Sequence, residues 1–268
     1  MARKRANVAK GRALITGASS GIGLELARLC AKRGYDIVIV ARSEDKLAEL
    51  ARELRAEDGV EVTVLAADLS RHEAPAEIVE ALSTKGIDVE LLVNNAGFAT
   101  YGPSHEQPVD KQLSMIQVNV AALTELTHRL LPAMVQRGSG GVLNVASTAA
   151  FLPGPGMAGY HATKAFVLHF SEAVAMELEG TGVTITALCP GPTESGFQSR
   201  AEMENARLVQ SGLMSARKVA EVGLAAVEKG KAVAVPGFSN RMIALAPRFF
   251  PRAFTARLVK RFLSPVGT

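Results

Sequence analysis

Tyr160 and Lys164 are the two residues of this sequence best suited to moving a proton. They lie four residues apart in the segment YHATK, and residues at this spacing share one face of a helix. A phenol has an ordinary pKa of about 10, but a neighbouring ammonium stabilises the phenolate and lowers that pKa. The pair therefore predicts acid–base chemistry, although a packed tyrosine beside a solvated lysine would give the same spacing.

A glycine-rich segment at residues 16–23, TGASSGIG, is suited to binding phosphate groups. It follows an apolar, β-rich run and precedes an amphipathic stretch. Glycines let the backbone turn tightly, and the helix that follows directs its unpaired N–H groups and positive dipole end at an anion. The position between a strand and a helix predicts dinucleotide binding. The residues that we expect to hold the dinucleotide here are Gly17, Ser19, Ser20, Gly21, Ile22 and Gly23.

The end of the second β-rich run indicates which dinucleotide binds. A site selective for NAD(H) would place Asp or Glu there to bind the ribose 2′-hydroxyl, but this sequence has Arg42. A guanidinium can pair with a 2′-phosphate in bidentate fashion, so the sequence favours NADP(H) over NAD(H). Glu44 and Asp45 follow closely, and we expect them to stabilise the first turn of a helix capped by Ser43.

Further cofactor contacts are expected after the third and fourth β-rich runs. Asp68 can accept a hydrogen bond from an adenine amino group, and small residues let a dinucleotide pass close to the backbone. The alternative is structural, with Asp68 capping a turn and the pair Asn94 and Asn95 bracing the strands. The residues predicted to contact the cofactor here are Asp68, Leu69, Asn95, Ala96 and Gly97.

Seven short apolar runs alternate with amphipathic stretches along the chain. Their continuous Val, Ile and Leu content indicates strands covered on both faces, as in a parallel sheet. The order predicts an α/β, Rossmann-like, doubly wound parallel sheet of about seven strands with helices on both faces, in a single domain spanning residues 1–268. The predicted strands are 13–16, 36–41, 61–66, 91–94, 141–146, 184–189 and 232–235, and the predicted helices are 22–32, 44–57, 73–83, 112–137, 157–179 and 216–228.

Composition narrows the class of protein further. The 268 residues are 48% hydrophobic, which is enough for a sizeable core. Cys30 and Cys189 have no disulfide or metal spacing, and the five histidines, including His161, have no metal-ligand pattern, so no metal is expected. The basic tail 1–10 lacks the apolar core of a secretory signal, and glycines and prolines interrupt the uncharged segment 138–163. We expect a soluble, cytoplasmic protein.

The distribution of basic residues sets one segment apart. Bases and acids are interleaved through most of the chain, so we expect no nucleic-acid partner. The C-terminal extension 238–268 instead contains six cations and no acid among Met, Ile, Leu and Phe. Its two amphipathic stretches, 240–246 and 253–263, predict packing on another subunit, with peripheral contact to an anionic membrane as the less favoured alternative.

Taken together, several ordered motifs resemble the short-chain dehydrogenase/reductase superfamily, in its compact single-domain branch. These motifs are TGASSGIG, the segment NNAG at 94–97, Asn119, Ser147, YHATK and the PGPT loop at 190–193, and the resemblance covers roughly residues 11–236. It implies a nicotinamide cofactor and a catalytic set of Asn119, Ser147, Tyr160 and Lys164. It also implies a homodimer or homotetramer that associates through the helices 112–137 and 157–179.

The resemblance implies a role for each of these residues. Tyr160 is the general acid in reduction and the base in oxidation, and Ser147 binds the substrate oxygen. Lys164 binds the nicotinamide ribose and lowers the pKa of Tyr160, and Asn119 helps to hold a water of a proton relay. Tyr160 and Lys164 therefore also belong to the cofactor site, and Pro190, Gly191 and Thr193 flank the nicotinamide amide.

The substrate is expected to be a small, mostly apolar carbonyl compound or alcohol, as in reductases of ketoacyl, steroid-like or general ketone and aldehyde substrates. A non-catalytic dinucleotide-binding sensor with the same fold is the alternative, and the intact catalytic set weighs against it. The residues expected to form an apolar pocket after the fifth and sixth strands are Phe151, Leu152, Pro153, Phe197, Met203, Leu208 and Met214.

Overall fold

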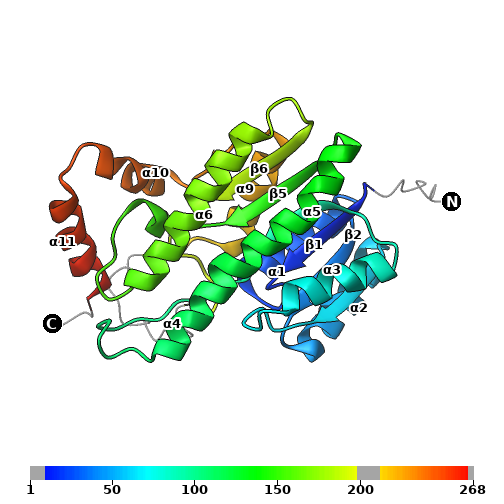
Figure 1. Ribbon diagram of the computed structural model, residues 1–268, viewed down its shortest axis with the longest axis horizontal. Helices are drawn as coiled ribbons and strands as arrows, with labels where there is room; N and C mark the ends of the chain where they lie inside the picture. The colour runs from blue at the N-terminus through cyan, green and yellow to red at the C-terminus, as the bar shows by residue number, and fades with distance from the viewer. Residues whose placement is uncertain (1–9, 198–211, 265–268) are drawn as a thin grey trace.

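A seven-stranded parallel sheet forms the centre of the protein. The computed structural model describes residues 10–197 and 212–264, and the strands follow the order β3-β2-β1-β4-β5-β6-β7 (Figure 1). The order reverses between β1 and β4, which opens a crevice at the carboxyl ends of these strands. The predicted Rossmann-like sheet is confirmed. The strands are β1 (Arg12–Thr16), β2 (Asp36–Ala41), β3 (Val62–Ala66), β4 (Val89–Asn94), β5 (Gly140–Val145), β6 (Val183–Leu188) and β7 (Val233–Ala234).

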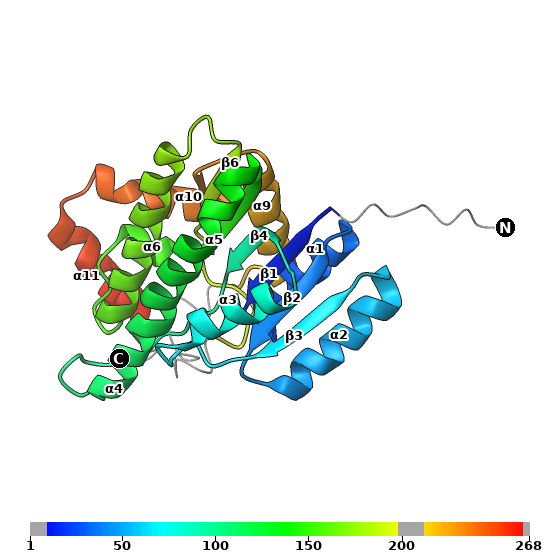
Figure 2. The ribbon, with the colours of Figure 1, turned by 45° about the vertical axis from the view of Figure 1, so that its right-hand side comes forward.

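Helices cover both faces of the sheet, as its apolar strands require. In β1, Ala13 and Ile15 pack into one core cluster and Leu14 into the other, because successive side chains of a strand point to opposite faces. The first cluster is covered by α1 (Gly21–Lys32), α2 (Glu44–Asp58) and α9 (Ala216–Glu228). The second is covered by α3 (Ala74–Thr84), α5 (Leu123–Arg137) and α6 (Ala158–Glu177), as Figures 1 and 2 show.

The prediction of one regular helix over residues 112–137 is wrong. The structure has α4 (Val109–Ile116), a π-helical segment η1 (Gln117–Ala122) and then α5. A π-turn adds residues to the helical path without ending the helix, and the apolar spacing of the sequence does not reveal it. Asn119 lies in this segment and is buried. The other predicted boundaries agree with the structure to within one or two residues, and β7 is shorter than expected.

The C-terminal extension folds into two helices at one end of the molecule. They are α10 (Phe238–Leu245) and α11 (Arg252–Leu263), joined by a short 3-10 turn η3 (Ala246–Arg248), and they are drawn in orange and red in Figure 1. The phenol of Tyr101 donates a hydrogen bond of 2.8 Å to the carbonyl oxygen of Leu263. The two helices include almost all of the two stretches that were predicted to be amphipathic. Among the described residues, no helix has the length and apolar character needed to cross a membrane.

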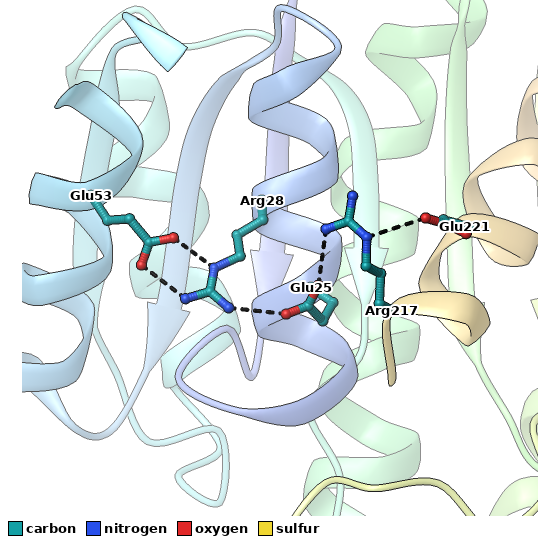
Figure 3. A network of polar contacts seen from close by, with 5 residues as sticks. All are labelled: Glu25, Arg28, Glu53, Arg217 and Glu221. Atoms are coloured by element: carbon teal, nitrogen blue, oxygen red, sulfur yellow. Dashed lines mark hydrogen bonds and ion pairs between the residues drawn. The ribbon is translucent and has the colours of Figure 1, made fainter. Parts of the chain in front are cut away.

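A network of ion pairs ties three helices together on the outside of one face (Figure 3). Arg28 of α1 makes bidentate bonds of 2.6 and 2.9 Å to Glu53 of α2 and a bond of 3.0 Å to Glu25. Arg217 of α9 pairs with Glu25 at 3.5 Å and with Glu221 at 3.3 Å. Hydrogen bonding to Arg28 lowers the pKa of Glu53, so the network stabilises the ionised carboxylate.

We predict that Glu53→Gln lowers the free energy of unfolding by about 1 kcal/mol at neutral pH, because it removes the bidentate pair. The pKa of Glu53 is lowered in the folded protein, so its contribution is complete above the ordinary value of 4.5 and is lost as the pH falls through the folded value. Urea denaturation across this pH range measures the difference. Glu57→Gln, an exposed change on the same helix, is the control. A difference that does not shrink in acid would contradict the assignment.

Candidate active site

A cavity of about 710 Å³ opens at the carboxyl ends of the strands. This volume is within the range of small-molecule sites. Three of the predicted site residues, Gly21, Gly23 and Asn119, do not line it. The predicted residues that do line it are Gly17, Ser19, Ser20, Ile22, Arg42, Asp68, Leu69, Asn95, Ala96, Gly97, Ser147, Tyr160, Lys164, Pro190, Gly191 and Thr193.

The glycine-rich turn after β1 is held by backbone contacts. Gly17 has φ +67°, and its N–H donates to the carbonyl oxygen of Val40 at 2.8 Å. A Cβ on Gly23 would collide with the carbonyl oxygen of Gly17, and one on Gly21 would lie 2.6 Å from the Cβ of Ser195. Gly21 and Gly23 therefore act by allowing close packing around the turn, although they do not line the cavity.

The N-terminus of α1 is suited to an anion. The helix begins at Gly21, immediately after the turn, and its first turn contains no acidic residue. Its unpaired N–H groups and positive dipole end are thus not neutralised by a carboxylate of that turn. A pyrophosphate fits this combination of a bare backbone turn and a helix N-terminus.

Asn95 and Asp68 both line the cavity and have structural roles as well. The amide nitrogen of Asn95 donates to the carbonyl oxygens of Thr16 at 2.9 Å and Gly17 at 3.2 Å, so it braces the glycine turn. The carboxylate of Asp68 accepts a 3.0 Å bond from the backbone N–H of Ser70. Both side chains therefore have the structural roles that the sequence offered as the alternative to cofactor binding. Both also line the cavity.

The cavity has two cations at the end near β2. Arg42 is exposed at the rim, and Lys46 of α2 lines the same part of the cavity, whereas Glu44 and Asp45 do not. Burial raises the pKa of Asp68, but its bonds to Ser70 and the charge of Arg42 outweigh this and lower it. Lys46 was missed from the sequence. Arg42 precedes α2, which begins at Glu44, so helical spacing does not relate the two residues and no pattern in the sequence placed Lys46 at the rim.

Ser147, Tyr160 and Lys164 meet at the middle of the cavity. Ser147 follows β5 and accepts a 3.1 Å bond from the backbone N–H of Ala149, which places its hydroxyl at the start of the 3-10 turn η2 (Thr148–Phe151). This hydroxyl donates a 3.4 Å bond to the carbonyl oxygen of Pro190, and its interaction with the Tyr160 phenol lowers the pKa of that phenol. The ammonium of Lys164 lies 5.8 Å from the centre of the Tyr160 ring and donates to the carbonyl oxygen of Val145 at 2.7 Å.

Burial shifts the pKa values of Tyr160 and Lys164 more than the sequence suggested. It raises the pKa of Tyr160 to about 12, against the opposing effect of the hydrogen bond with Ser147. It also lowers the pKa of Lys164 to about 8. The expected lowering of the Tyr160 pKa by Lys164 is therefore not found in this structure: burial raises that pKa, only the interaction with Ser147 opposes it, and the Lys164 ammonium is bonded to a backbone carbonyl.

Asn119 is buried beside the cavity and does not line it. Its amide nitrogen donates to the carbonyl oxygen of Phe98 at 3.0 Å and to the hydroxyl of Thr163 at 3.1 Å, and its oxygen accepts from the N–H of Phe98 at 3.1 Å. A Cβ on Gly97 would lie 3.0 Å from the Asn119 oxygen and 3.5 Å from the Lys164 nitrogen. The π-helical segment thus brings Asn119 close to Lys164 while its side chain fixes the loop after β4.

His161 is a packing residue, as expected from its position beside Tyr160. It is buried, and its Nδ1 lies 2.6 Å from the carbonyl oxygen of Leu152. Burial lowers its pKa, so the neutral ring is favoured. The residues that the structure describes contain no group of three or more His, Cys, Asp or Glu that could hold a metal ion.

The apolar wall of the cavity differs from the predicted one. Leu152 and Phe197 line it, whereas Phe151, Pro153 and Met214 do not. The remaining predicted residues, Met203 and Leu208, lie outside the described residues. The C-terminal helices were missed as a wall, although the apolar spacing of α11 was visible in the sequence. The apolar residues that the prediction omitted include Phe98, Met157, Ile243, Leu258, Val259, Phe262 and Leu263.

The loop after β6 connects the cavity to α10. The hydroxyl of Thr193 donates to the carbonyl oxygen of Gly191 at 2.9 Å. Gly191 packs so closely on the buried Asn240 that a Cβ there would collide with its amide, and Asn240 is fixed by a 2.7 Å bond to the carbonyl oxygen of Pro236. The C-terminal helices and the loop that is predicted to flank the nicotinamide are thus one packed unit.

Comparison with known proteins gives a consistent assignment. A family model described as short chain dehydrogenase matches residues 11–206. A short chain dehydrogenase of Pseudocercospora fijiensis is 40% identical over 68% of this chain and 60% of its own length, so the chain spans about three-fifths of that relative. Sulfoacetaldehyde reductase 2 of Chromohalobacter salexigens is 38% identical over 69% of this chain and 73% of its own.

The fold comparison agrees with the sequence comparison. A short-chain dehydrogenase from Sphingobium yanoikuyae, solved in complex with NADPH, superposes with a TM-score of 0.80 at 35% identity. The superposition covers 89% of this chain and 93% of the other. The NADP(H) expected from Arg42 is thus the cofactor of this structural neighbour.

We predict that the buried Lys164 leaves a pH signature in stability. Its pKa is lowered to about 8 in the folded protein, so from about pH 8 to the ordinary value of 10.5 the unfolded state binds more protons. The free energy of unfolding of the wild type should therefore rise by roughly 3 kcal/mol relative to Lys164→Met across this interval. Denaturation at a series of pH values measures it, with the exposed change Lys218→Met as the control. Parallel profiles for wild type and Lys164→Met would refute the burial argument.

Proposed function

The chain belongs to the short-chain dehydrogenase family, and we propose that it is an NADP(H)-dependent oxidoreductase that interconverts a carbonyl and an alcohol on a small, mostly apolar substrate. One observation carries the proposal. The side chains of Ser147 and Tyr160, whose interaction lowers the Tyr160 pKa, both lie on the wall of the same cavity that the glycine turn and Arg42 line. Two hydroxyls placed in this way can bind one carbonyl oxygen beside a bound dinucleotide.

Different residues of the cavity are suited to bind different parts of a dinucleotide. The glycine turn and the N-terminus of α1 would hold the pyrophosphate, and Asp68 and Leu69 would face the adenine. Arg42 and Lys46 would bind a 2′-phosphate, which supports NADP(H) over NAD(H). Lys164 would bind the nicotinamide ribose, and the loop of Pro190, Gly191 and Thr193 would flank the nicotinamide amide. When bound, the nicotinamide supplies or accepts the hydride.

Tyr160 is suited to supply the proton in the reducing direction. Its pKa of about 12 keeps the phenol protonated at neutral pH. As negative charge develops on the substrate oxygen, the phenol donates its proton there, and the hydroxyl of Ser147 donates a second hydrogen bond. Oxidation of an alcohol needs the phenolate, so alkaline pH favours that direction. Asn119, close to Lys164, would help to hold a water through which Tyr160 recovers its proton.

The wall around this centre supports an apolar substrate. Phe197 packs against the Tyr160 ring with ring centres 5.4 Å apart, and Phe98 and Met157 belong to the same apolar cluster. The C-terminal helices add Leu258, Phe262 and Leu263. Chemically, a medium-chain or cyclic ketone, an aldehyde, a ketoacyl ester or a steroid would suit such a wall.

A homodimer or homotetramer and a cytoplasmic setting complete the proposal. Apolar side chains are exposed on α4 and α6, including Leu113, Phe166 and Met176, which supports association through these helices. Cys30 and Cys189 are both buried and unpaired, and burial raises the pKa of each thiol to about 12, so both are protonated and unreactive. This arrangement suits a reducing compartment.

We predict that Tyr160→Phe reduces kcat by at least about a thousandfold, because general acid catalysis is lost. The dissociation constant for NADPH should change by less than about threefold, since the phenol is not expected to dominate binding of the dinucleotide. NADPH oxidation with a panel of ketones and aldehydes measures turnover, and fluorescence titration measures binding. Tight NADPH binding by a wild type that turns over none of the panel would instead favour the non-catalytic sensor.

We also predict that Arg42→Ala raises the KM for NADPH by about tenfold or more, because a charge-assisted pair with the 2′-phosphate is lost. The KM for NADH should stay within about threefold, as NADH has no such phosphate. Lys46→Ala should act in the same direction. Arg52→Ala, an exposed change on the same helix, is the control. Equal losses with both cofactors would overturn the assignment of Arg42.

A further inference from the structure

The C-terminal cap, residues 238–264, exposes an unusual amount of apolar surface. Five of the ten phenylalanines of the sequence lie in this segment. Phe238 and Phe249 are 79% and 78% exposed, and the rings of Phe250 and Phe254 lie together at the surface with centres 5.4 Å apart. The large apolar side chains exposed on the cap are Phe238, Met242, Ile243, Leu245, Phe249, Phe250, Phe254, Leu258 and Phe262.

The helix α11 has two apolar faces with different surroundings. At four-residue spacing, Thr255, Val259 and Leu263 face the protein, and Thr255 and Leu263 are 3% exposed. One residue earlier in each turn, Phe254, Leu258 and Phe262 are 44–50% exposed. The core of the protein accounts for the first stripe. The second stripe lies partly at the cavity, which Leu258 and Phe262 line, yet all three of its side chains stay exposed.

The charge of the cap is of one sign. Its six cations are all exposed, and no acid occurs between residue 238 and the last residue, 268. Within residues 10–197 and 212–264, none of the six forms an ion pair. The whole chain has a formal charge of +4, so the part outside the cap is slightly acidic. The six cations are Arg241, Arg248, Arg252, Arg257, Lys260 and Arg261.

We propose that the C-terminal cap docks the protein on an anionic membrane surface. Arg257 and Arg261 lie three residues after Phe254 and Leu258, so their guanidinium groups flank the exposed apolar stripe of α11. Basic side chains can extend to lipid phosphates while aromatic rings insert below them. A helix of 12 residues is only about 18 Å long, so α11 lies along such a surface.

Charge decides against a second copy of this chain as the occupant. Two caps related by a two-fold axis would bring the six cations of one against the six of the other, with no acid on either to compensate. Packing of the cap on another cap thus lacks complementary charge, and the rest of the chain, which is only slightly acidic, offers far less negative charge than an anionic lipid surface supplies. We therefore assign association between subunits to other faces.

Because the cap forms part of the cavity wall, docking of the cap would also affect the cavity. Ile243, Leu258 and Phe262 are exposed and also line the cavity. A membrane against the cap would therefore lie at the apolar mouth of the substrate site. This consequence rests on the proposed function, whereas the docking itself does not.

Vesicle flotation of the full chain tests the docking. We expect the wild type to bind vesicles of phosphatidylcholine with about 30% phosphatidylglycerol at least tenfold more tightly than pure phosphatidylcholine vesicles, and about 500 mM salt to weaken the binding. Each cation near such a surface contributes roughly fivefold, so Arg257→Glu with Arg261→Glu should weaken binding by at least about 25-fold. Phe249→Ser with Phe254→Ser should weaken it by about tenfold.

Matched changes elsewhere control for charge and apolarity. Arg52→Glu on α2 and Val109→Ser on α4, where Val109 is 66% exposed, should leave flotation unchanged. None of the four substituted cap residues lines the cavity, so NADPH-dependent turnover and melting temperature should stay at wild-type values and report separately on enzyme and fold. A wild type that does not float with anionic vesicles would overturn the docking. So would cap substitutions that leave flotation intact, or that change only the mass of the oligomer in solution.

Discussion

The close approach of α1 to the turn after β1 is the constraint on which the site depends. Gly23 packs against the carbonyl oxygen of Gly17 so tightly that no Cβ fits between them, and the amide of Asn95 bridges the turn to the strand beside it. This contact brings the helix N-terminus up to the point where the strand order reverses. The crevice, the anion-binding end of α1 and the cavity all follow from that backbone packing.

The burial of two polar side chains is the second constraint on the site. Tyr160 and Lys164 are both buried on α6, and the Lys164 ammonium is bonded to the backbone carbonyl of Val145. Burial makes the charged forms of both residues unfavourable, which explains the raised pKa of Tyr160 and the lowered pKa of Lys164. In a dry site of this kind, hydrogen-bond donors act strongly on charge that develops in a transition state.

The C-terminal cap connects the site to the outside of the molecule. Asn240 fixes α10 against the loop of Gly191, and Tyr101 fixes the end of α11. The cap therefore completes the apolar wall of the cavity, in part through side chains such as Leu258 and Phe262 that are also exposed, and it carries further exposed rings and cations. The same short helices thus combine a cavity wall with an exposed apolar and basic surface.

The sequence by itself determined the sheet, the covering helices and the glycine turn, because apolar periodicity and the spacing of special residues are local properties, and its resemblance to a family singled out the proposed catalytic set. Tertiary structure alone decided the π-helical turn that turns Asn119 inward, the second cation Lys46 at the rim and the apolar wall formed by α11. It also decided the pKa values of Tyr160 and Lys164. These features depend on burial and on contacts between segments far apart in the chain, and no local pattern records how much water a folded protein excludes.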